Sequence, residues 1–233
     1  MTVVCGRFAS ITGLEQVAEM FAVDAVNAPV RPPRYNVAPT TDVLAVTAKV
    51  RSPGTPAVRE LTTLRWGLIP SWAKDASVGS RMINARAEGV DSKRSFRAPF
   101  ARRRCLIPAD VFYEWQREGS RRLPFAIARR DRRPMAFAGL WEVWRGLGDG
   151  AQGAVTSAAI VTTSANEVMS AIHDRMPVIV EKDDWDGWLD PEADRSYLLG
   201  LLKPASRGLI EAWRVSDLVN KVSNQGPELI DPV

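Results

Sequence analysis

The sequence is poor in the residues that most often build metal or redox centres. Its 233 residues include two cysteines, Cys5 and Cys105, and a single histidine, His173. No C-x-x-C pair occurs, so the pattern gives little support for a zinc site, and we expect no cofactor. In a reducing compartment two cysteines remain free thiols by default, and we interpret Cys105 as an inert thiol on a strand.

The sequence also lacks long apolar runs. No stretch approaches the ~20 apolar residues that a membrane-spanning helix requires, and the first residues lack the charged head and apolar core of a signal peptide. With 45% hydrophobic and 25% charged residues, the composition is that of an ordinary globular protein. We therefore expect a cytoplasmic protein that makes no membrane contact.

Lysine is scarce, and arginine carries most of the positive charge. Between Arg81 and Arg133, 14 Arg and one Lys face six acidic residues, which gives this segment a charge of +9. From Glu181 onward, 11 acidic residues face six basic ones, a charge of −5. A concentrated positive region suits a polyanion such as nucleic acid. The codon usage of a GC-rich genome would also enrich arginine, so charge alone leaves both interpretations open.

Short strand patterns separated by turn residues dominate the chain. Strands are predicted at Val43–Val50, Val58–Trp66, Arg104–Ile107, Val111–Gln116, Pro124–Arg129, Met135–Trp144 and Ala158–Thr163. Capping boxes at 12–15 and 164–167 predict two helices, and further short helices are expected near Ser95–Phe100, Asp183–Leu189 and Arg195–Leu202. Gly146–Gly153 reads as a connection. We predict one α+β domain over residues 1–233, built mainly on antiparallel sheet with several short helices.

Cys5 lies close to the start of the chain, where a cysteine can acquire a special reactivity. If processing makes it the first residue, its α-amine and thiol form one bidentate nucleophile. The amine condenses with an aldehyde to an imine, and the thiol then closes a five-membered thiazolidine ring. An α-amine titrates near pH ~8, so part of it is unprotonated at neutral pH. As numbered, Cys5 has four residues in front of it.

Two other side chains could supply acid–base chemistry. His173, in His-Asp-Arg-Met-Pro, is the only side chain whose ordinary pKa lies near neutrality. Glu114 lies among aromatic residues of a predicted strand, where partial burial would raise its pKa. Each has a plain alternative: His173 held by Asp174 or solvated, and Glu114 pointing outward by strand alternation.

Polar and aromatic residues could bind an oxygen-rich, base-bearing ligand. Asn84 and Arg86 lie two apart, so in an extended segment they project to one side and could hold a hydroxyl and a phosphate. A loop-stabilising role is equally compatible with this spacing. Trp66, Trp72 and Trp115 could be stacking platforms for unpaired bases, although tryptophan is more often half-buried core.

Taken together and in order, these motifs resemble the SRAP family of SOS response-associated peptidases, or abasic-site processing proteins. The matching blocks are Cys5–Phe8, Arg34–Pro39, Trp66–Trp72, Ile83–Glu88, Arg104–Pro108, Phe112–Trp115, Ile160–Thr162, Ile172–Pro177 and Val219–Val222. They run from near the first residue to near the last, so the resemblance covers essentially the whole chain.

The resemblance implies a β-rich α+β domain that acts as a monomer in the response to DNA damage. Its partner would be single-stranded DNA containing abasic sites, including junctions with duplex. The implied activity is self-crosslinking to the abasic-site aldehyde through an N-terminal cysteine, with peptidase or DNA lyase-like activity. The implied roles are Cys5 as nucleophile, Asn84 on the amine or sugar, Glu114 as proton shuttle and His173 at the deoxyribose. The implied DNA-binding residues are Arg7, Trp72, Arg86, Arg94, Thr162 and Arg175.

The chain departs from the family pattern at its start, because the family has cysteine directly after the initiator methionine. Either Val4 is a GTG start codon, so that the product begins Met-Cys-Gly-Arg-Phe, or the chain removes Met1–Val4 itself. Two alternative functions stay open. One is an N-terminal-nucleophile cysteine autopeptidase, and the other is a single-stranded-DNA-binding module without chemistry.

Overall fold

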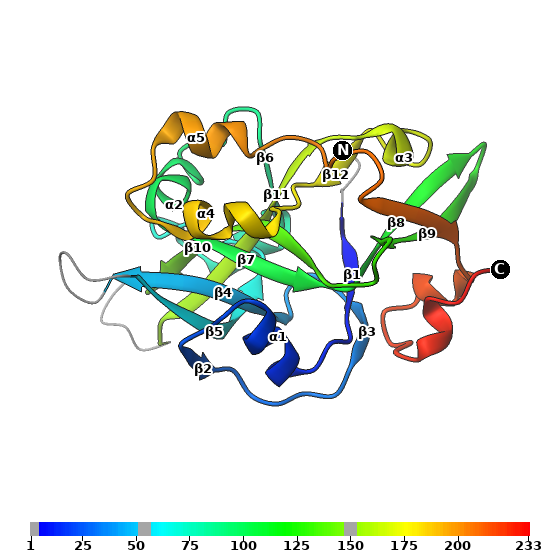
Figure 1. The fold of residues 1–233 in the computed structure, drawn as a ribbon, viewed down its shortest axis with the longest axis horizontal. Helices are drawn as coiled ribbons and strands as arrows, with labels where there is room; N and C mark the ends of the chain where they lie inside the picture. Colours follow the sequence, from blue (N-terminus) through cyan, green and yellow to red (C-terminus); the bar gives the residue numbers. More distant parts are fainter. Residues whose placement is uncertain (1–4, 51–56, 147–152) are drawn as a thin grey trace.

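Two β-sheets and several short helices make up the computed structural model, which describes residues 5–50, 57–146 and 153–233 (Figure 1). The first sheet has the strand order β13-β9-β8-β1-β3, and all its pairings are antiparallel. Its strands are β1 (Arg7–Ser10), β3 (Arg34–Val37), β8 (Val111–Glu118), β9 (Arg121–Arg129) and β13 (Ile210–Arg214). The α+β class with mostly antiparallel strands is thereby confirmed.

The second sheet follows the order β12-β11-β10-β7-β4-β5-β2, with β6 paired to β11. Its strands are β2 (Ala25–Asn27), β4 (Asp42–Val50), β5 (Ala57–Trp66), β6 (Asn84–Arg86), β7 (Arg104–Ala109), β10 (Met135–Trp144), β11 (Val155–Ser164) and β12 (Arg175–Pro177). Strand β11 also pairs in parallel with β5, so β11, β10, β7, β4 and β5 close into a ring. Closure leaves these five strands without a free edge.

Strand β7 shows how side-chain alternation divides the interior into two cores. Cys105 and Ile107 face a core shared with Phe8 and Phe112 of the first sheet. Leu106 faces a second core, which lies under the helices. Cys105 is fully buried, and burial raises the pKa of its thiol far above the usual value, in line with the predicted inert thiol.

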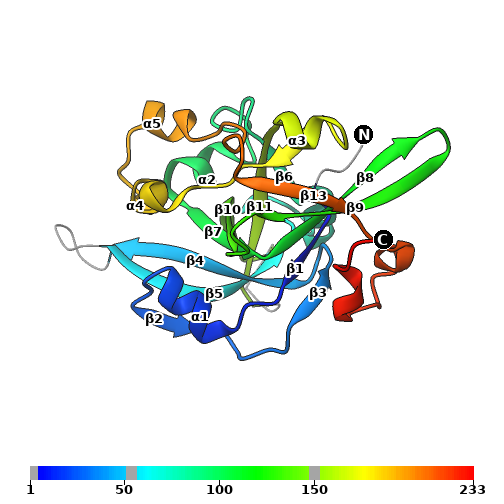
Figure 2. The same cartoon turned by 45° about the vertical axis from the view of Figure 1, so that its right-hand side comes forward.

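The helices are short, and α2, α4 and α5 gather on one side of the ring (Figures 1 and 2). The α-helices are α1 (Leu14–Met20), α2 (Arg97–Arg102), α3 (Glu167–Ser170), α4 (Trp185–Leu189) and α5 (Arg195–Gly200). The 3₁₀ turns are η1 (Ala76–Arg81), η2 (Lys182–Asp184), η3 (Asp217–Asn220) and η4 (Pro227–Leu229). Phe21, just after α1, stacks on Trp185 of α4 with ring centroids 4.2 Å apart. No helix in the described ranges is long and apolar enough to cross a membrane.

Both predicted helix starts are displaced. Helix α1 is capped by Gly13, because the Thr12 hydroxyl donates instead to Asp110. Helix α3 is capped by Asn166, whose side chain accepts a 3.0 Å hydrogen bond from the Met169 N–H. The segment 34–37 is strand β3, which pairs with β1. Most of the predicted connection at 146–153 lies outside the described residues.

Candidate active site

Cys5 and Glu114 meet where β1 begins beside β8. The antiparallel register pairs Arg7 with Tyr113, which brings Cys5, two residues before β1, against the middle of β8. The backbone N–H of Cys5 donates a 2.5 Å hydrogen bond to Oε1 of Glu114. Both residues are buried, and Cys5 adopts a left-handed backbone with φ of 46°. A left-handed non-glycine residue is strained, and such strain collects at functional sites.

Glu114 is buried, which contradicts the simple alternation that would point it outward. Its side chain lies on the same face of β8 as Phe112, the face turned toward the core between the sheets. The opposite face is also covered, because Tyr113 packs in a smaller cluster with Ala9 and Val219. Burial raises the pKa of Glu114 to about 7, although hydrogen bonds from the Cys5 and Trp115 N–H groups favour the carboxylate. A carboxyl group with this pKa can both accept and donate a proton at neutral pH.

The Cys5 thiol is a poor nucleophile in the chain as numbered. Burial, together with the neighbouring Glu114 carboxylate, raises the pKa of the thiol well above its usual value. A free thiolate is therefore disfavoured, although the thiolate is the attacking form in most cysteine chemistry.

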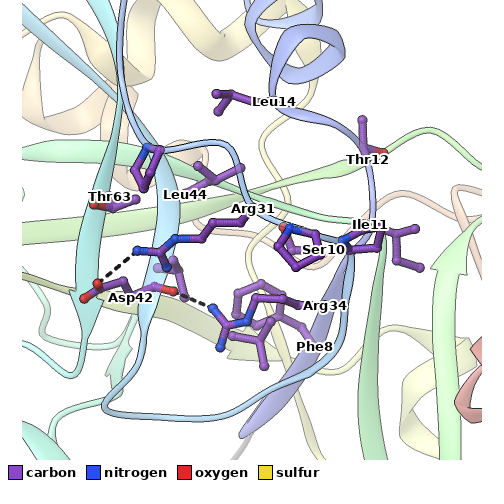
Figure 3. Close-up of a pocket in the computed structure, with 15 residues that line it drawn as sticks. Phe8, Ser10, Ile11, Thr12, Leu14, Arg31, Arg34, Asp42, Leu44 and Thr63 are labelled. Carbon is purple, nitrogen blue, oxygen red and sulfur yellow. Dashed lines mark hydrogen bonds and ion pairs between the residues drawn. The ribbon is translucent and has the colours of Figure 1, made fainter. Parts of the chain in front are cut away.

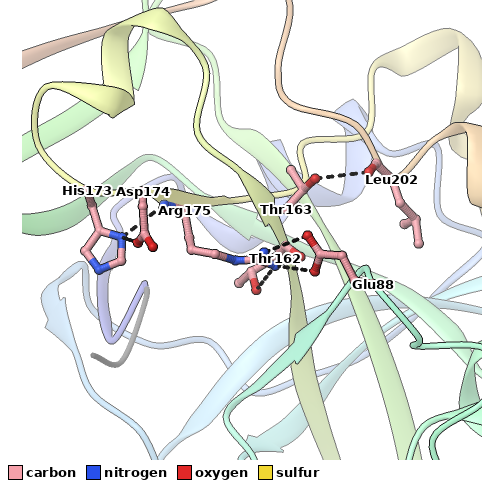
Figure 4. Close-up of polar contacts among 7 residues, drawn as sticks. All are labelled: Glu88, Thr162, Thr163, His173, Asp174, Arg175 and Leu202. Atoms are coloured by element: carbon pink, nitrogen blue, oxygen red, sulfur yellow. Dashed lines mark hydrogen bonds and ion pairs between the residues drawn. The ribbon is translucent and has the colours of Figure 1, made fainter. Parts of the chain in front are cut away.

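His173 lies in the loop between α3 and β12, and Figure 4 shows it beside Asp174 and Arg175. Its Nδ1 accepts a 3.0 Å hydrogen bond from the Arg175 N–H and lies 2.9 Å from Oδ1 of Asp174. Burial lowers the pKa of His173, while Asp174 opposes that effect. The same Asp174 carboxylate adds to the raised pKa of Glu114, so the two acid–base groups are electrostatically linked. The loop is tied to β8 by Gln116, whose Nε2 donates to the Ala171 carbonyl at 2.7 Å.

Asn84 and Arg86 lie on β6, which pairs in parallel with β11. The register sets Asn84 opposite Ile160 and Arg86 opposite Thr162. Ile160 belongs to the same buried cluster as Cys5, so β6 borders the core that holds the cysteine. Arg86 is exposed, in line with a residue available to a ligand.

Arg175 is held in place by protein groups (Figure 4). Its guanidinium makes two hydrogen bonds to the Glu88 carboxylate, at 2.7 and 2.9 Å, and one of 2.7 Å to the Thr162 carbonyl. Thr162, proposed from sequence to bind DNA, is buried at 1% exposure and lies behind this guanidinium. Its position supports Arg175 rather than offering a surface of its own.

The three tryptophans proposed as stacking platforms differ in exposure and in their partners. Trp66 is fully buried and donates to the Ile83 carbonyl at 3.0 Å, so the prediction that it could stack on an unpaired base was wrong. Trp72 is 45% exposed, and the Arg94 guanidinium lies 4.4 Å from its ring centroid. Trp115 is half-buried and donates to the Asn220 side chain at 2.7 Å. The Trp72–Arg94 pair therefore presents an exposed aromatic and a cation together.

Arg7 is engaged within the protein through a residue that sequence reasoning missed. Asn36, in the block 34–39, is 1% exposed and accepts from Arg7 at 2.9 Å. The same amide donates to the carbonyls of Val219 and Lys221, both at 3.1 Å. Arg7 donates to the Val219 carbonyl as well, at 3.1 Å. These bonds hold the η3 segment near β1, and the only sequence signal for Asn36 was its place in a matching block.

Within the described ranges, no group of three His, Cys, Asp or Glu side chains is placed to hold a metal ion. A small pocket near α1 is lined by apolar side chains and by Arg31, Arg34 and Asp42 (Figure 3). Arg31 pairs with the Asp42 carboxylate at 3.2 Å, and Arg34 donates to the Asp42 carbonyl at 2.7 Å. None of the predicted site residues lines this pocket. The candidate chemistry therefore centres on Cys5 and Glu114.

Comparisons with known proteins identify the family. The family model of the SOS response associated peptidase (SRAP) matches residues 4–222. The abasic site processing protein YoqW of Bacillus subtilis (strain 168) is 41% identical over 230 residues, covering 97% of this chain and 99% of that protein. The abasic site processing protein YedK of Escherichia coli (strain K12) is 32% identical over 238 residues, covering 98% of this chain and 100% of that protein.

A more distant relative and a solved structure extend the comparison. The abasic site processing protein HMCES of Gallus gallus is 31% identical over 227 residues, covering 86% of this chain and 66% of that protein. The crystal structure of a Bacteroides thetaiotaomicron protein has a TM-score of 0.86 and 23% identity, covering 98% of this chain and 100% of that chain, which shows a shared fold. On the family match and these identities, the chain belongs to the SOS response associated peptidase (SRAP) family.

Proposed function

We propose that this protein captures abasic sites in single-stranded DNA as a covalent crosslink, acting as a monomer with Cys5 as its first residue. The observation that carries the proposal is the short contact between the Cys5 nitrogen and Glu114. With Val4 attached, this nitrogen is an amide and cannot attack a carbonyl. As the α-amine of a first residue, it would face a buried acid–base group at hydrogen-bond distance.

The reaction follows from these two groups. The α-amine of Cys5 adds to the ring-opened aldehyde carbon, and the carbinolamine loses water to give an imine. The thiol then adds to the imine carbon, its proton passes to nitrogen, and a thiazolidine forms with one water released overall. Glu114 would free the amine as a base and protonate the departing hydroxyl as an acid. A pKa of about 7 suits both tasks at neutral pH.

The remaining site residues would hold the DNA around the lesion. Asn84 would orient the amine or the sugar, and His173 would assist at the deoxyribose. Arg86, Arg94 and Trp72 are the exposed candidates for phosphate and base contacts. Arginines that bind the backbone leave the bases unread, which suits a lesion in any sequence.

Arg7 and Arg175 already have protein partners, so both would contribute mainly through the positive field they supply. Arg7 donates to Asn36 and Arg175 to Glu88. Thr162, beneath the Arg175 guanidinium, would act through that arginine. The family match begins at residue 4, directly before Cys5, which supports placing the reactive end of the protein at this cysteine.

The autopeptidase alternative is less well supported. A peptidase would need a thiolate, and the pKa of the Cys5 thiol is raised. Mass spectrometry of the N-terminus tests for self-cleavage. Release of Met1–Val4 by the wild type, but not by Glu114→Gln or His173→Ala, would support self-cleavage.

The test of the proposed function uses protein beginning at Cys5 and a single-stranded oligonucleotide with one abasic site. We expect a heat-stable adduct on a denaturing gel, no adduct with Cys5→Ala, and none with protein that retains Met1–Val4. Absence of the adduct from the Cys5-first protein, or an undiminished adduct with Cys5→Ala, would show the proposal to be wrong.

A further inference from the structure

The hairpin formed by β8 and β9 projects beyond the rest of the molecule in both Figure 1 and Figure 2. Its tip is a tight turn at Gly119, whose φ of +60° is a conformation that glycine adopts without strain. The outer half of the hairpin, residues 117–122, is exposed. It carries Arg117, Arg121 and Arg122 against one acidic residue, Glu118.

In the described part of the chain, none of these three arginines makes a hydrogen bond or an ion pair through its side chain. Arg129, at the other end of β9, behaves differently, because it is paired with Asp131 at 2.8 Å and with Glu181 at 3.3 Å. The hairpin tip thus holds guanidinium groups whose donors are all available to an external ligand.

The pairing within the hairpin is electrostatically unfavourable. Strand register sets Arg117 directly opposite Arg122. Among the strand pairs that the structure describes, it is the only one with two charges of the same sign opposite each other. Like charges directly opposite destabilise a sheet, and Glu118 opposite Arg121 offsets only part of the positive charge. An anionic ligand across the tip would relieve this repulsion.

The tip is close to the proposed reaction centre and rigidly joined to it. Arg117 follows Glu114 by three residues on the same strand, a distance of about 10 Å. Gln116, between them, fixes the strand to the loop that carries His173. Along one strand of B-form DNA the helix axis rises about 3.4 Å per phosphate, so the tip is within reach of phosphates a few nucleotides from a nucleotide bound at Glu114.

We propose that the outer half of the β8–β9 hairpin is an arm that binds the phosphate backbone of the DNA strand a few nucleotides beyond the abasic site. Arginine suits this task because its planar guanidinium binds phosphate through two parallel hydrogen bonds. The arm would add affinity without reading sequence, since phosphates carry no sequence information. The inference rests on the proposed function for the identity of the ligand.

The experiment compares two charge-matched triple variants. The arm variant, Arg117→Ser/Arg121→Ser/Arg122→Ser, removes the three arginines of the arm. The control variant, Arg130→Ser/Arg133→Ser/Lys182→Ser, removes three exposed cations near the other end of β9. Binding to intact single-stranded DNA is measured at several salt concentrations. The slope of log K against log salt is negative, and each lost phosphate contact makes it less steep by ~0.7 for a single strand. The slope of the arm variant should therefore be about 2 units less steep than that of the wild type, and the slope of the control variant should change much less.

A second measurement locates the arm on the DNA. Oligonucleotides are shortened from one side of the abasic site, and then from the other. The affinity difference between wild type and the arm variant should vanish when the strand is cut to one nucleotide on one side, and persist when it is cut on the other.

Two results would overturn the proposal. Equal slopes for the arm variant and the wild type would mean that the arm binds no phosphate. Its arginines would then be better explained as a contact for an acidic protein surface. Equal losses in the two triple variants would mean that only overall charge matters. Thermal melting serves as the folding control, because removing the Arg117–Arg122 repulsion should leave the melting temperature unchanged or raise it.

The arm and the crosslink can fail separately. If Cys5-first wild type forms no adduct, the proposed function is wrong, while the salt slopes on intact DNA still decide the arm. If the arm is real, the variant at saturating abasic DNA should crosslink to the wild-type extent, since none of its three arginines touches the reacting atoms.

Discussion

The Cys5 N–H donates to Glu114 across 109 positions of sequence, at 2.5 Å and away from water. The contact joins Cys5, two residues before β1, to the middle of β8, and the antiparallel register of the two strands holds it in place. It places a carboxyl group with a pKa of about 7 on the one nitrogen that becomes an α-amine when Cys5 is the first residue.

Replacing Glu114 with Gln in Cys5-first protein should slow crosslinking by about 10²- to 10⁴-fold, the usual contribution of a general acid–base group. The amide keeps the shape and can still accept a hydrogen bond from the nitrogen, but it cannot exchange a proton at neutral pH. The rate is measured from gel time courses at saturating abasic DNA. Glu118→Gln, an exposed position on the same strand, is the control and should keep the wild-type rate; a full rate in Glu114→Gln would remove the proton-shuttle role.

Glu114 should also make the stability of the protein that retains Met1–Val4 depend on pH. Because burial raises its pKa from 4.5 to about 7, the folded state binds the proton more tightly than the unfolded state. This contribution is fully present below pH ~4.5 and is lost as the pH rises through about 7, a change of roughly 3 kcal/mol in unfolding free energy. Urea titrations of wild type and Glu114→Gln between pH 4 and 8 test it. The wild type should lose stability relative to the variant, and parallel curves would contradict the assigned pKa.

Asp174→Asn should move the pH–rate profile of crosslinking to lower pH. Asp174 lies 2.9 Å from His173 Nδ1 and also raises the pKa of Glu114, so its removal should lower the pKa of both groups. The nearby Arg175 charge, which remains, acts on His173 in the same direction. Because the Asp174 side chain is 86% exposed, salt should weaken the effect. Asp231→Asn is the exposed control, and identical profiles for wild type and Asp174→Asn at low salt would show that Asp174 has no influence.

The sequence predicted most of the strands because their patterns are local. The strand at Met135–Trp144 has the predicted bounds, and the strand predicted at Val58–Trp66 differs by one residue. Turn residues and apolar runs decide such elements without help from distant parts of the chain. The helix predicted from Thr12 started one residue late, because a tertiary contact with Asp110 took the Thr12 hydroxyl. Local capping rules cannot anticipate a competing partner 98 positions away.

The candidate site was predictable as a set of residues but not as a geometry. Alternation alone pointed Glu114 outward, and only the two-sided burial of β8 reverses that conclusion. The bonds that occupy Arg7 depend on Asn36, a residue with no chemistry that sequence reasoning would single out. The pairing of Arg175 with Glu88 likewise joins two segments 87 positions apart, so no spacing rule reveals it.

Glu88→Gln should strengthen binding of intact single-stranded DNA by several-fold, with a steeper salt dependence. The Glu88 carboxylate now takes two hydrogen bonds from Arg175, and a phosphate would have to compete with it. Neutralising Glu88 releases the guanidinium while Thr162 still holds it from behind. Fluorescence anisotropy at two salt concentrations measures the change. Asp91→Asn, which removes the carboxylate paired with Arg195, is the charge-matched control. An equal gain in affinity in Asp91→Asn would mean that the change in net charge, and not the release of Arg175, explains the effect.

Asn36→Ala should destabilise the fold by about 2–3 kcal/mol without changing the crosslinking rate of protein that remains folded. The buried Asn36 side chain joins Arg7 to the carbonyls of Val219 and Lys221, and its loss removes these three hydrogen bonds, while Arg7 still donates to the Val219 carbonyl. Asn224→Ala, which removes an exposed amide bonded to the Leu218 carbonyl, should cost less than about 1 kcal/mol. Urea midpoints and adduct time courses, both taken well below the melting temperature, separate the two effects. A slower rate at unchanged stability would instead place Asn36, and the segment it holds, in the reaction itself.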